Sequence, residues 1–191
     1  MSFTKILKMD LESKPLSGAA FLENGKILVK DGDYKSFLIQ KGYGIKEGIF
    51  LVLSGEEALY LISEGRLRLF EGDHELTLKD ATEKLIPIDP DVWIKFLIYR
   101  DLRDKGYVVC KGYGIGLNFL LYERGTYGEQ PAKYLVIGVS EGKPVKIKDL
   151  IEIVRSSMYS DKELLLAVVD RRGEVVYYKL SQGFEELQSD E

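Results

Sequence analysis

The sequence predicts a protein of mixed α and β structure (α+β or α/β) with a small mixed N-terminal domain and a C-terminal mixed sheet on which helices pack. Hydrophobic residues make up 45% of the 191 residues and charged residues 30%, as in folded proteins. A chain of this length buries one large core or two small ones. The stretch IPIDPD at 86–91 interrupts the periodic segments with two prolines and two aspartates. We therefore predict domains at 1–88 and 89–182, followed by an acidic tail at 183–191.

The N-terminal domain is predicted from short apolar runs separated by turn residues. The segment 19–31 reads as a hairpin, because two apolar runs flank Glu23-Asn24-Gly25. Ser54 and Glu57 have the spacing of a capping box, which predicts a helix from there to Gly65. The remaining segments are expected to form strands at 49–53, 66–70 and 74–78 and a short helix at 79–85.

The C-terminal domain is predicted to begin with a helix. We expect Asp89 to cap this helix, Pro90 to occupy its first position and Gly106 to end it. A second helix is expected at 146–158, where apolar residues recur at helical spacing. The strands are expected at 107–111, 118–123, 134–139, 163–170 and 174–180, the last two joined by a turn at 171–173. Strands and helices in this order favour a mixed sheet with helices on it.

Composition excludes several classes of protein. The net charge of −4 argues against a lone RNA-binding protein, which would carry a basic surface. No run reaches the roughly 18 apolar residues that span a bilayer, and charges interrupt the apolar start, so we expect a cytoplasmic protein. The single cysteine, Cys110, lies in a strand-like run and is interpreted as a core residue. The small number of Asn, Gln, Cys and Met residues is typical of thermophile proteins.

The motif KGYGI occurs twice, at 41–45 and at 111–115. The flanking sequences diverge, so five shared residues do not establish a duplication. The glycines at 112–116 are not followed at once by a helix, which a dinucleotide-binding fingerprint requires. We interpret them as a bend between two strands.

Three segments together resemble the archaeal tRNA-splicing endonucleases. These segments are SGEEALYLISEGRL, YRDLRDKGYVVCKGYGIGLNFLLYERG and KELLLAVVDRRGEVVYY, and the similarity runs in order over residues 15–180. The resemblance implies a nuclease-like C-terminal domain, assembly as dimers or tetramers, and metal-independent cleavage of precursor tRNA without a cofactor. In that reaction a 2′-hydroxyl attacks the adjacent phosphate, which leaves a 2′,3′-cyclic phosphate and a 5′-hydroxyl.

The family divides this reaction among a tyrosine, a histidine and a lysine. Tyr122 matches the tyrosine and Lys162 the lysine, but Pro131 stands at the histidine position, three residues before Tyr134. Proline carries no titratable proton, and loss of a positioned acid lowers a rate by ~10²- to 10⁴-fold. Tyr122 and Lys162 are therefore interpreted as vestigial positions, and packing or an exposed charge explains them equally well. Glu129 is the only nearby candidate for a replacement acid.

Other residues match family positions outside the triad. Arg155 matches an arginine that stacks on an unpaired RNA base, although an exposed helix arginine explains it equally well. The only histidine, His74, lies far away in the sequence and is interpreted as an exposed structural residue. Asp170 and Glu174 match a loop that inserts acidic side chains into a basic cleft of a neighbouring subunit, and a simple surface turn is the alternative.

The missing histidine favours the branch of the family that is built from two different subunits. We expect this chain to be the structural subunit, which docks a histidine-containing catalytic subunit and positions precursor tRNA at its bulge-helix-bulge. Val176 and Tyr178, on alternate positions of the last strand, are expected at the subunit interface. The isolated chain could form a homodimer. The alternatives are an active homomeric endonuclease with another acid, a metal-dependent nuclease on a similar frame, and an assembly protein unrelated to splicing.

Overall fold

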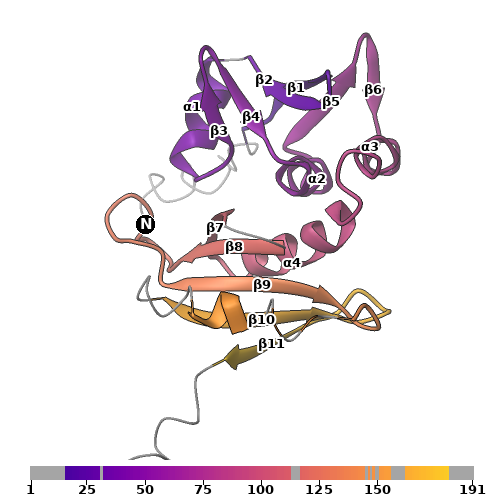
Figure 1. Cartoon of the computed structure of the whole chain (residues 1–191). Helices are drawn as coiled ribbons and strands as arrows, with labels where there is room; N and C mark the ends of the chain where they lie inside the picture. Colours follow the sequence, from indigo (N-terminus) through magenta and orange to yellow (C-terminus); the bar gives the residue numbers. More distant parts are fainter. Residues whose placement is uncertain are drawn as a thin grey trace, which may run out of the picture.

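The computed structural model describes residues 16–30, 32–112, 117–144, 146, 148, 151–155 and 162–180. It contains two mixed sheets and the helices packed on them, with an N-terminal domain followed by a C-terminal domain (Figure 1). The predicted fold class is therefore confirmed. The predicted boundary between residues 88 and 89 falls between two helices and stays a prediction, and the predicted tail lies outside the described residues.

The N-terminal sheet has six strands in the order β3-β4-β2-β1-β5-β6. Strands β1 and β5 are parallel, and all other neighbours are antiparallel. The strands are β1 (Gly18–Glu23), β2 (Lys26–Val29), β3 (Ile45–Glu47), β4 (Phe50–Leu53), β5 (Leu67–Glu71) and β6 (His74–Leu76). The predicted hairpin is confirmed as β1 and β2. Its turn has positive φ angles at Asn24 (50°) and Gly25 (76°), as a tight two-residue hairpin turn requires.

Three helices accompany this sheet: α1 (Gly32–Gln40), α2 (Gly55–Ser63) and α3 (Leu78–Leu85). The predicted start of α2 is confirmed, since the Glu57 carboxylate accepts a hydrogen bond from the Ser54 amide at 2.9 Å. The sequence did not predict α1 or β3. Helix α1 buries only Tyr34 and Leu38, so its apolar face gives a weak periodic signal.

The C-terminal sheet has five strands in the order β11-β10-β9-β8-β7, and only β9 and β10 are parallel. The strands are β7 (Val108–Lys111), β8 (Leu117–Tyr122), β9 (Tyr134–Ser140), β10 (Glu163–Val169) and β11 (Val175–Leu180). All five agree with the predicted positions within a few residues. The described part of the helix predicted at 146–158 is helical at 148 and 151–155.

Helix α4 (Val92–Asp104) begins later than predicted. Asp91, not Asp89, occupies the N-cap position, so Pro90 precedes the helix. The reason is a turn before the helix, in which the Asp89 carboxylate accepts a hydrogen bond from the Asp91 amide at 3.2 Å and its carbonyl accepts one from the Val92 amide at 3.0 Å. The prediction of Asp89 as the cap was wrong.

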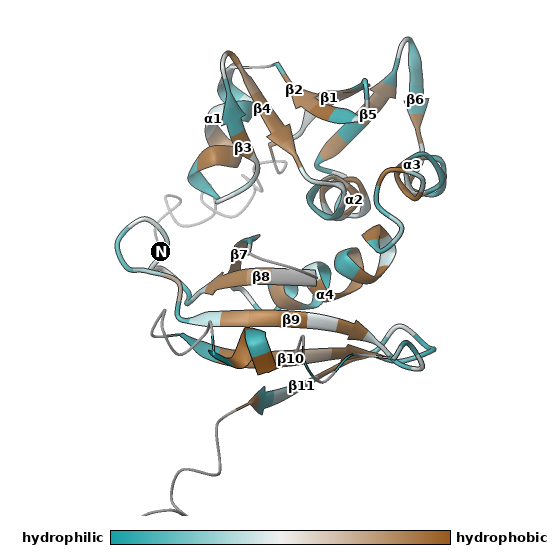
Figure 2. Cartoon of the chain, viewed as in Figure 1, coloured by the Kyte–Doolittle hydropathy of each residue, from teal (hydrophilic) through white to brown (hydrophobic). Residues whose placement is uncertain are grey.

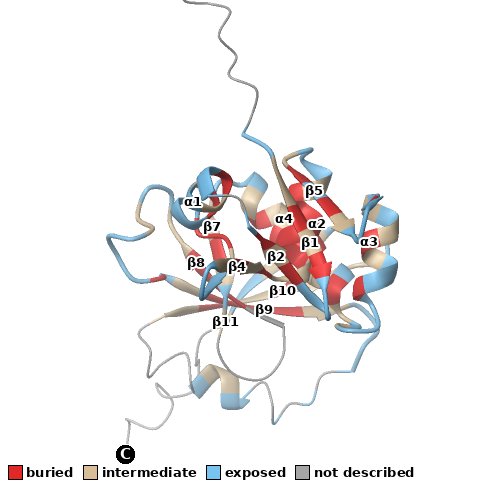
Figure 3. Ribbon diagram, turned by 90° about the horizontal axis from the view of Figure 1, so that it is seen from above, coloured by how far each residue is buried: buried red, intermediate tan, exposed pale blue. Residues whose placement is uncertain are grey.

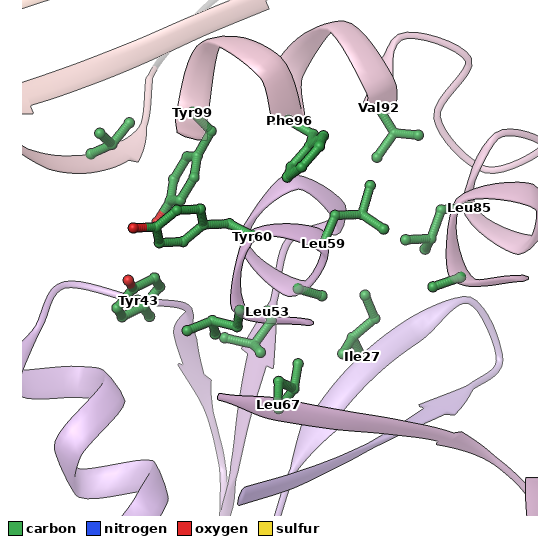
Figure 4. Close-up of a cluster of buried hydrophobic side chains, with 14 of the residues drawn as sticks. Ile27, Tyr43, Leu53, Leu59, Tyr60, Leu67, Leu85, Val92, Phe96 and Tyr99 are labelled. Carbon is green, nitrogen blue, oxygen red and sulfur yellow. The ribbon is translucent and has the colours of Figure 1, made fainter. Parts of the chain in front are cut away.

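Helices α2 and α4 lie between the two sheets (Figure 1). Phe96 and Tyr99 of α4 point toward Leu59 and Tyr60 of α2 (Figure 4), and the rings of Tyr60 and Tyr99 meet edge-on at 5.7 Å. Burial is concentrated along β1, α2 and α4 (Figure 3). Residues of both sheets thus belong to one continuous hydrophobic core that crosses the domain boundary.

A smaller cluster covers the opposite face of the C-terminal sheet. It is formed by Leu120, Ala132, Leu135, Ile137 and Leu164, with Ile153 and Val154 of the 151–155 helix packed against it. Among the helices that the structure describes, none is both long enough and apolar enough to cross a membrane.

Candidate functional site

Three of the predicted site positions, Tyr122, Pro131 and Lys162, lie toward the same end of the C-terminal sheet, which we call the site edge: the end at which β8 finishes and β9 and β10 begin. Strand β8 ends there at Tyr122, while β9 and β10 both begin there, because β8 runs antiparallel to β9 and β10 runs parallel to it. The Lys133 amide donates to the Leu121 carbonyl at 2.9 Å, and the Glu163 amide donates to the Lys133 carbonyl at 3.0 Å. Lys133 is thereby held between the end of β8 and the start of β10, two residues after Pro131 and next to the residue that follows Lys162.

Residues 123–133 form the loop that connects β8 to β9 at this end of the sheet. The loop is coloured mainly hydrophilic in Figure 2, in contrast to the apolar strand β9 that follows. Tyr122, its neighbour in β8, is half-buried, and its ring packs edge-on against Tyr127 at 5.0 Å and 90°. Lys162 is also half-buried. A phenol and an ammonium group therefore lie at one sheet edge, in a partly desolvated setting that strengthens electrostatic interactions.

The predicted histidine position contributes no proton to this edge. Pro131 is exposed, and its neighbour Ala132 is buried in the smaller cluster. Lys133 is exposed and forms an ion pair with Glu123 at 2.7 Å, a hydrogen bond that raises the pKa of Lys133. A lysine with a raised pKa holds its proton and cannot serve as an acid near neutral pH.

The carboxyl group at the start of β10 is also ion-paired. Glu163 lies 2.7 Å from Lys179 of β11, and this hydrogen bond lowers the pKa of Glu163. At neutral pH the group is an ionised acceptor and has no proton to donate. The predicted replacement acid, Glu129, is exposed, and its amide donates to the Thr126 carbonyl at 3.0 Å within the loop.

The remaining predicted residues lie away from this edge. His74 is exposed on β6, the edge strand of the other sheet. Arg155 is exposed at the end of the described 151–155 helix. Cys110 is half-buried in β7, where burial raises the pKa of its thiol, so the thiolate is disfavoured at neutral pH. The described residues contain no group of three or more His, Cys, Asp or Glu placed to hold a metal ion.

The turn between β10 and β11 is built around Asp170. One carboxylate oxygen of Asp170 accepts hydrogen bonds from the amides of Arg172 (2.8 Å) and Glu174 (2.9 Å). Glu174 is exposed, whereas Asp170 is half-buried. The Asp170 carboxylate thus stabilises its own turn, whereas Glu174 is exposed at the surface.

Strand β11 forms an edge of the five-stranded sheet. Val176 and Tyr178 are 49% and 54% exposed, whereas Val175 and Tyr177 on the opposite face pack against the core. An open edge with apolar side chains on its outer face is suited to pairing with another chain.

Sequence reasoning missed three residues that organise the surroundings of this end of the sheet: Arg103, Tyr127 and Lys133. Arg103 of α4 donates to the carbonyls of Lys41 (3.0 Å) and Val109 (3.3 Å), and so ties the N-terminal domain to β7. These contacts join segments far apart in the chain, so no local pattern could have indicated them. The first KGYGI motif marks the segment that Arg103 binds, but nothing in the motif identifies Arg103 as its partner.

Two models of one protein family match this chain. Residues 18–82 match the family model described as tRNA intron endonuclease, N-terminal domain, and residues 92–177 match the model described as tRNA intron endonuclease, catalytic C-terminal domain.

The chain is similar to several proteins named tRNA-splicing endonuclease. Identity to that of Methanococcus vannielii is 38% over 162 residues, which cover 84% of this chain and 92% of the relative. Identity to that of Pyrococcus furiosus is 35%, covering 74% and 82% of the two chains, and to that of Thermococcus onnurineus 31%, covering 91% and 97%. Two matched domains in order and relatives of nearly full length establish that this chain belongs to the tRNA intron endonuclease family.

Proposed function

We propose that this protein is the structural, non-catalytic subunit of a heteromeric tRNA-splicing endonuclease. Pro131 carries the proposal, because it stands where the family resemblance requires a histidine. Transfer of the phosphate to the 2′-oxygen breaks the bond to the 5′-oxygen, and this leaving group needs a proton. Lys133 and Glu163, whose backbones are hydrogen-bonded to each other beside this position, are both held in ion pairs.

The proposed role of the chain is to dock a histidine-containing catalytic subunit. The exposed face of β11 supports this role, because Val176 and Tyr178 offer apolar surface beside an unpaired strand edge. Glu174 supports it as well, since this exposed carboxylate extends from a rigid turn and could enter a basic cleft of the partner. Within the complex, Arg155 is the candidate for contact with an unpaired base of the precursor tRNA.

The experiment that tests this role is reconstitution with a histidine-containing family member from the same organism. The complex should cleave a bulge-helix-bulge RNA, and Lys162→Ala in this chain should leave the rate unchanged. Val176→Asp should weaken assembly by about 1–3 kcal/mol, because it places a charge at a desolvated interface. Ile45→Asp is the matched control, since Ile45 is 60% exposed on the other sheet. Equal assembly by both variants would exclude the β11 interface.

An active homomeric endonuclease is the second candidate. The position of Tyr122 and Lys162 at one sheet edge favours it, because two of the three required residue types remain together there. In this case Glu129 would supply the acid. Cleavage by the chain alone that Glu129→Gln removes would establish this candidate and end the proposal of a structural subunit.

A further inference from the structure

The loop at 123–133 is attached to the N-terminal domain through one aromatic side chain. Most of the loop is exposed, but Tyr127 is half-buried. A Cβ atom placed on Gly42 would lie 3.0 Å from the ring carbon Cζ of Tyr127 and 2.5 Å from Cγ1 of Val108. The ring of Tyr127 therefore rests directly on the backbone of Gly42, where any side chain would displace it.

The segment that receives Tyr127 is rigidly held. Gly42 has a φ of 75°, which favours glycine, and its amide donates to the Ile39 carbonyl at 3.0 Å at the end of α1. The Arg103 guanidinium lies 4.0 Å from the centre of the Tyr43 ring and donates to the carbonyls of Lys41 and Gly42. The first KGYGI motif is thus a docking surface whose position is fixed relative to α4.

The other side of Tyr127 faces the candidate site. Its ring meets the Tyr122 ring edge-on, with the two centres 5.0 Å apart. Edge-on aromatic pairs contribute about 0.5–1.5 kcal/mol beyond burial, and they prefer defined geometry. One continuous series of contacts therefore runs from Gly42 in the N-terminal domain through Tyr127 to Tyr122 at the end of β8.

The same loop is anchored at its start and its end by polar contacts. Arg124 donates to the Lys105 carbonyl at the end of α4, and the Lys133 amide donates to the Leu121 carbonyl. Between these anchors, the Gln130 amide donates to the Thr126 carbonyl at 2.9 Å. Within the described residues, Tyr127 is the only residue in the middle of the loop whose ring contacts the N-terminal domain.

We propose that Tyr127 is a positioning residue through which the N-terminal domain sets the place of Tyr122 and of the loop that carries residue 131. The proposal rests on the assignment of this sheet edge as the site of the family. It explains why an exposed loop carries a half-buried tyrosine. A partner or an RNA that moves the N-terminal domain would move the site with it.

Tyr127→Ser is the decisive variant, because it removes the ring and leaves Gly42 and Val108 unchanged. Gly42→Ala is a supporting variant, since an added Cβ would lie 3.0 Å from Tyr127 but 2.5 Å from Val108, which pairs with Tyr122 in the sheet. Its matched control is Gly48→Ala, because Gly48 has a similar φ of 57° but no atom within 4 Å of an added Cβ. Both variants carry the same kind of backbone strain, of order 1 kcal/mol. Tyr127→Phe keeps the ring and Tyr127→Ser removes it, so this pair separates the ring from its hydroxyl.

Two measurements on the isolated chain report positioning: the ¹³C and ¹H resonances of the Tyr122 ring, and hydrogen exchange at the amides of Glu129, Gln130 and Lys133. Gly42→Ala and Tyr127→Ser should shift the Tyr122 resonances and raise exchange at these amides by at least about fivefold. Gly48→Ala should leave both near wild type. Tyr127→Phe loses the hydrogen bond between the Tyr127 hydroxyl and Cys110 but keeps the ring, so it should change both less than Tyr127→Ser. Wild-type hydrogen exchange at these amides in Tyr127→Ser, or equal behaviour of Gly42→Ala and Gly48→Ala, would overturn the proposal. Neither measurement uses RNA or a partner, so failure of the proposed function would show separately, as cleavage by the chain alone.

Discussion

At the scale of single residues, burial and hydrogen bonding shift the pKa of Glu57 in opposite directions. Its carboxylate accepts the amides of Gly44 (3.0 Å) and Ser54 (2.9 Å), and both bonds favour the ionised form. Only 6% of the residue is exposed, and this burial outweighs the hydrogen bonds and raises the pKa of Glu57 to about 7. Burial raises the pKa of the adjacent Glu56 as well.

Stability should therefore depend on pH through Glu57. The pKa of Glu57 is about 7 in the folded state, compared with its usual value of 4.5. In the window between these two pH values, the folded protein therefore binds more protons than the unfolded protein. The free energy of unfolding should fall as pH rises across the window, by up to about 1.4 kcal/mol per pH unit from this group. Urea unfolding at several pH values measures the slope. Glu57→Gln should reduce it but not abolish it, because Glu56 contributes in the same direction, and an unchanged slope would refute the assignment.

At the scale of elements, two substitutions of Asp170 in the turn between β10 and β11 distinguish the hydrogen bonds of its side chain from its negative charge. Asp170→Ala removes the acceptor of two backbone amides and should destabilise the chain by about 1–2 kcal/mol in urea unfolding. Asp170→Asn keeps an oxygen acceptor and should stay within about 0.5 kcal/mol of wild type. If Asp170→Asn nevertheless impaired assembly with a partner, the charge of Asp170 would have a role between subunits.

Helix α4 should couple the two domains, because it packs against both. Phe96 is 1% exposed within the shared core, and Phe96→Ala should destabilise the whole chain by about 3–5 kcal/mol. Ile86, 44% exposed at the C-cap of α3, is the control, and Ile86→Ala should have an effect below about 1 kcal/mol. Calorimetry should show one transition for wild type and for both variants. Two separate transitions would show that the domains unfold independently.

Elements with a strong local signal could be predicted from the sequence. The β1–β2 hairpin had Asn-Gly at its turn, and α2 had both a capping residue and an amphipathic face. Helix α1 had neither signal, and the three residues of β3 are all exposed, so no alternation marks that strand. The start of α4 was misplaced because two aspartates near one proline each resemble a cap, and only the backbone turn distinguishes them.

At the scale of the whole molecule, the candidate site is assembled from segments that only the sheet topology brings together. Tyr122, Pro131 and Lys162 could be named from the resemblance of their surroundings, but their meeting depends on the direction of β8, β9 and β10. The contact between Gly42 and Tyr127 spans both domains and had no local signature. Sequence therefore indicated the residue types of the site, whereas its support by the N-terminal domain emerged from tertiary packing.

The most direct test of the account is a cleavage assay with the isolated chain and a precursor tRNA that contains a bulge-helix-bulge. The account predicts no cleavage above background, because Pro131 stands where the family resemblance requires the histidine that would protonate the leaving 5′-oxygen. Addition of a histidine-containing family member should restore cleavage to 2′,3′-cyclic phosphate and 5′-hydroxyl ends. Cleavage by the isolated chain at an ordinary enzymatic rate, lost on Lys162→Ala, would contradict the account.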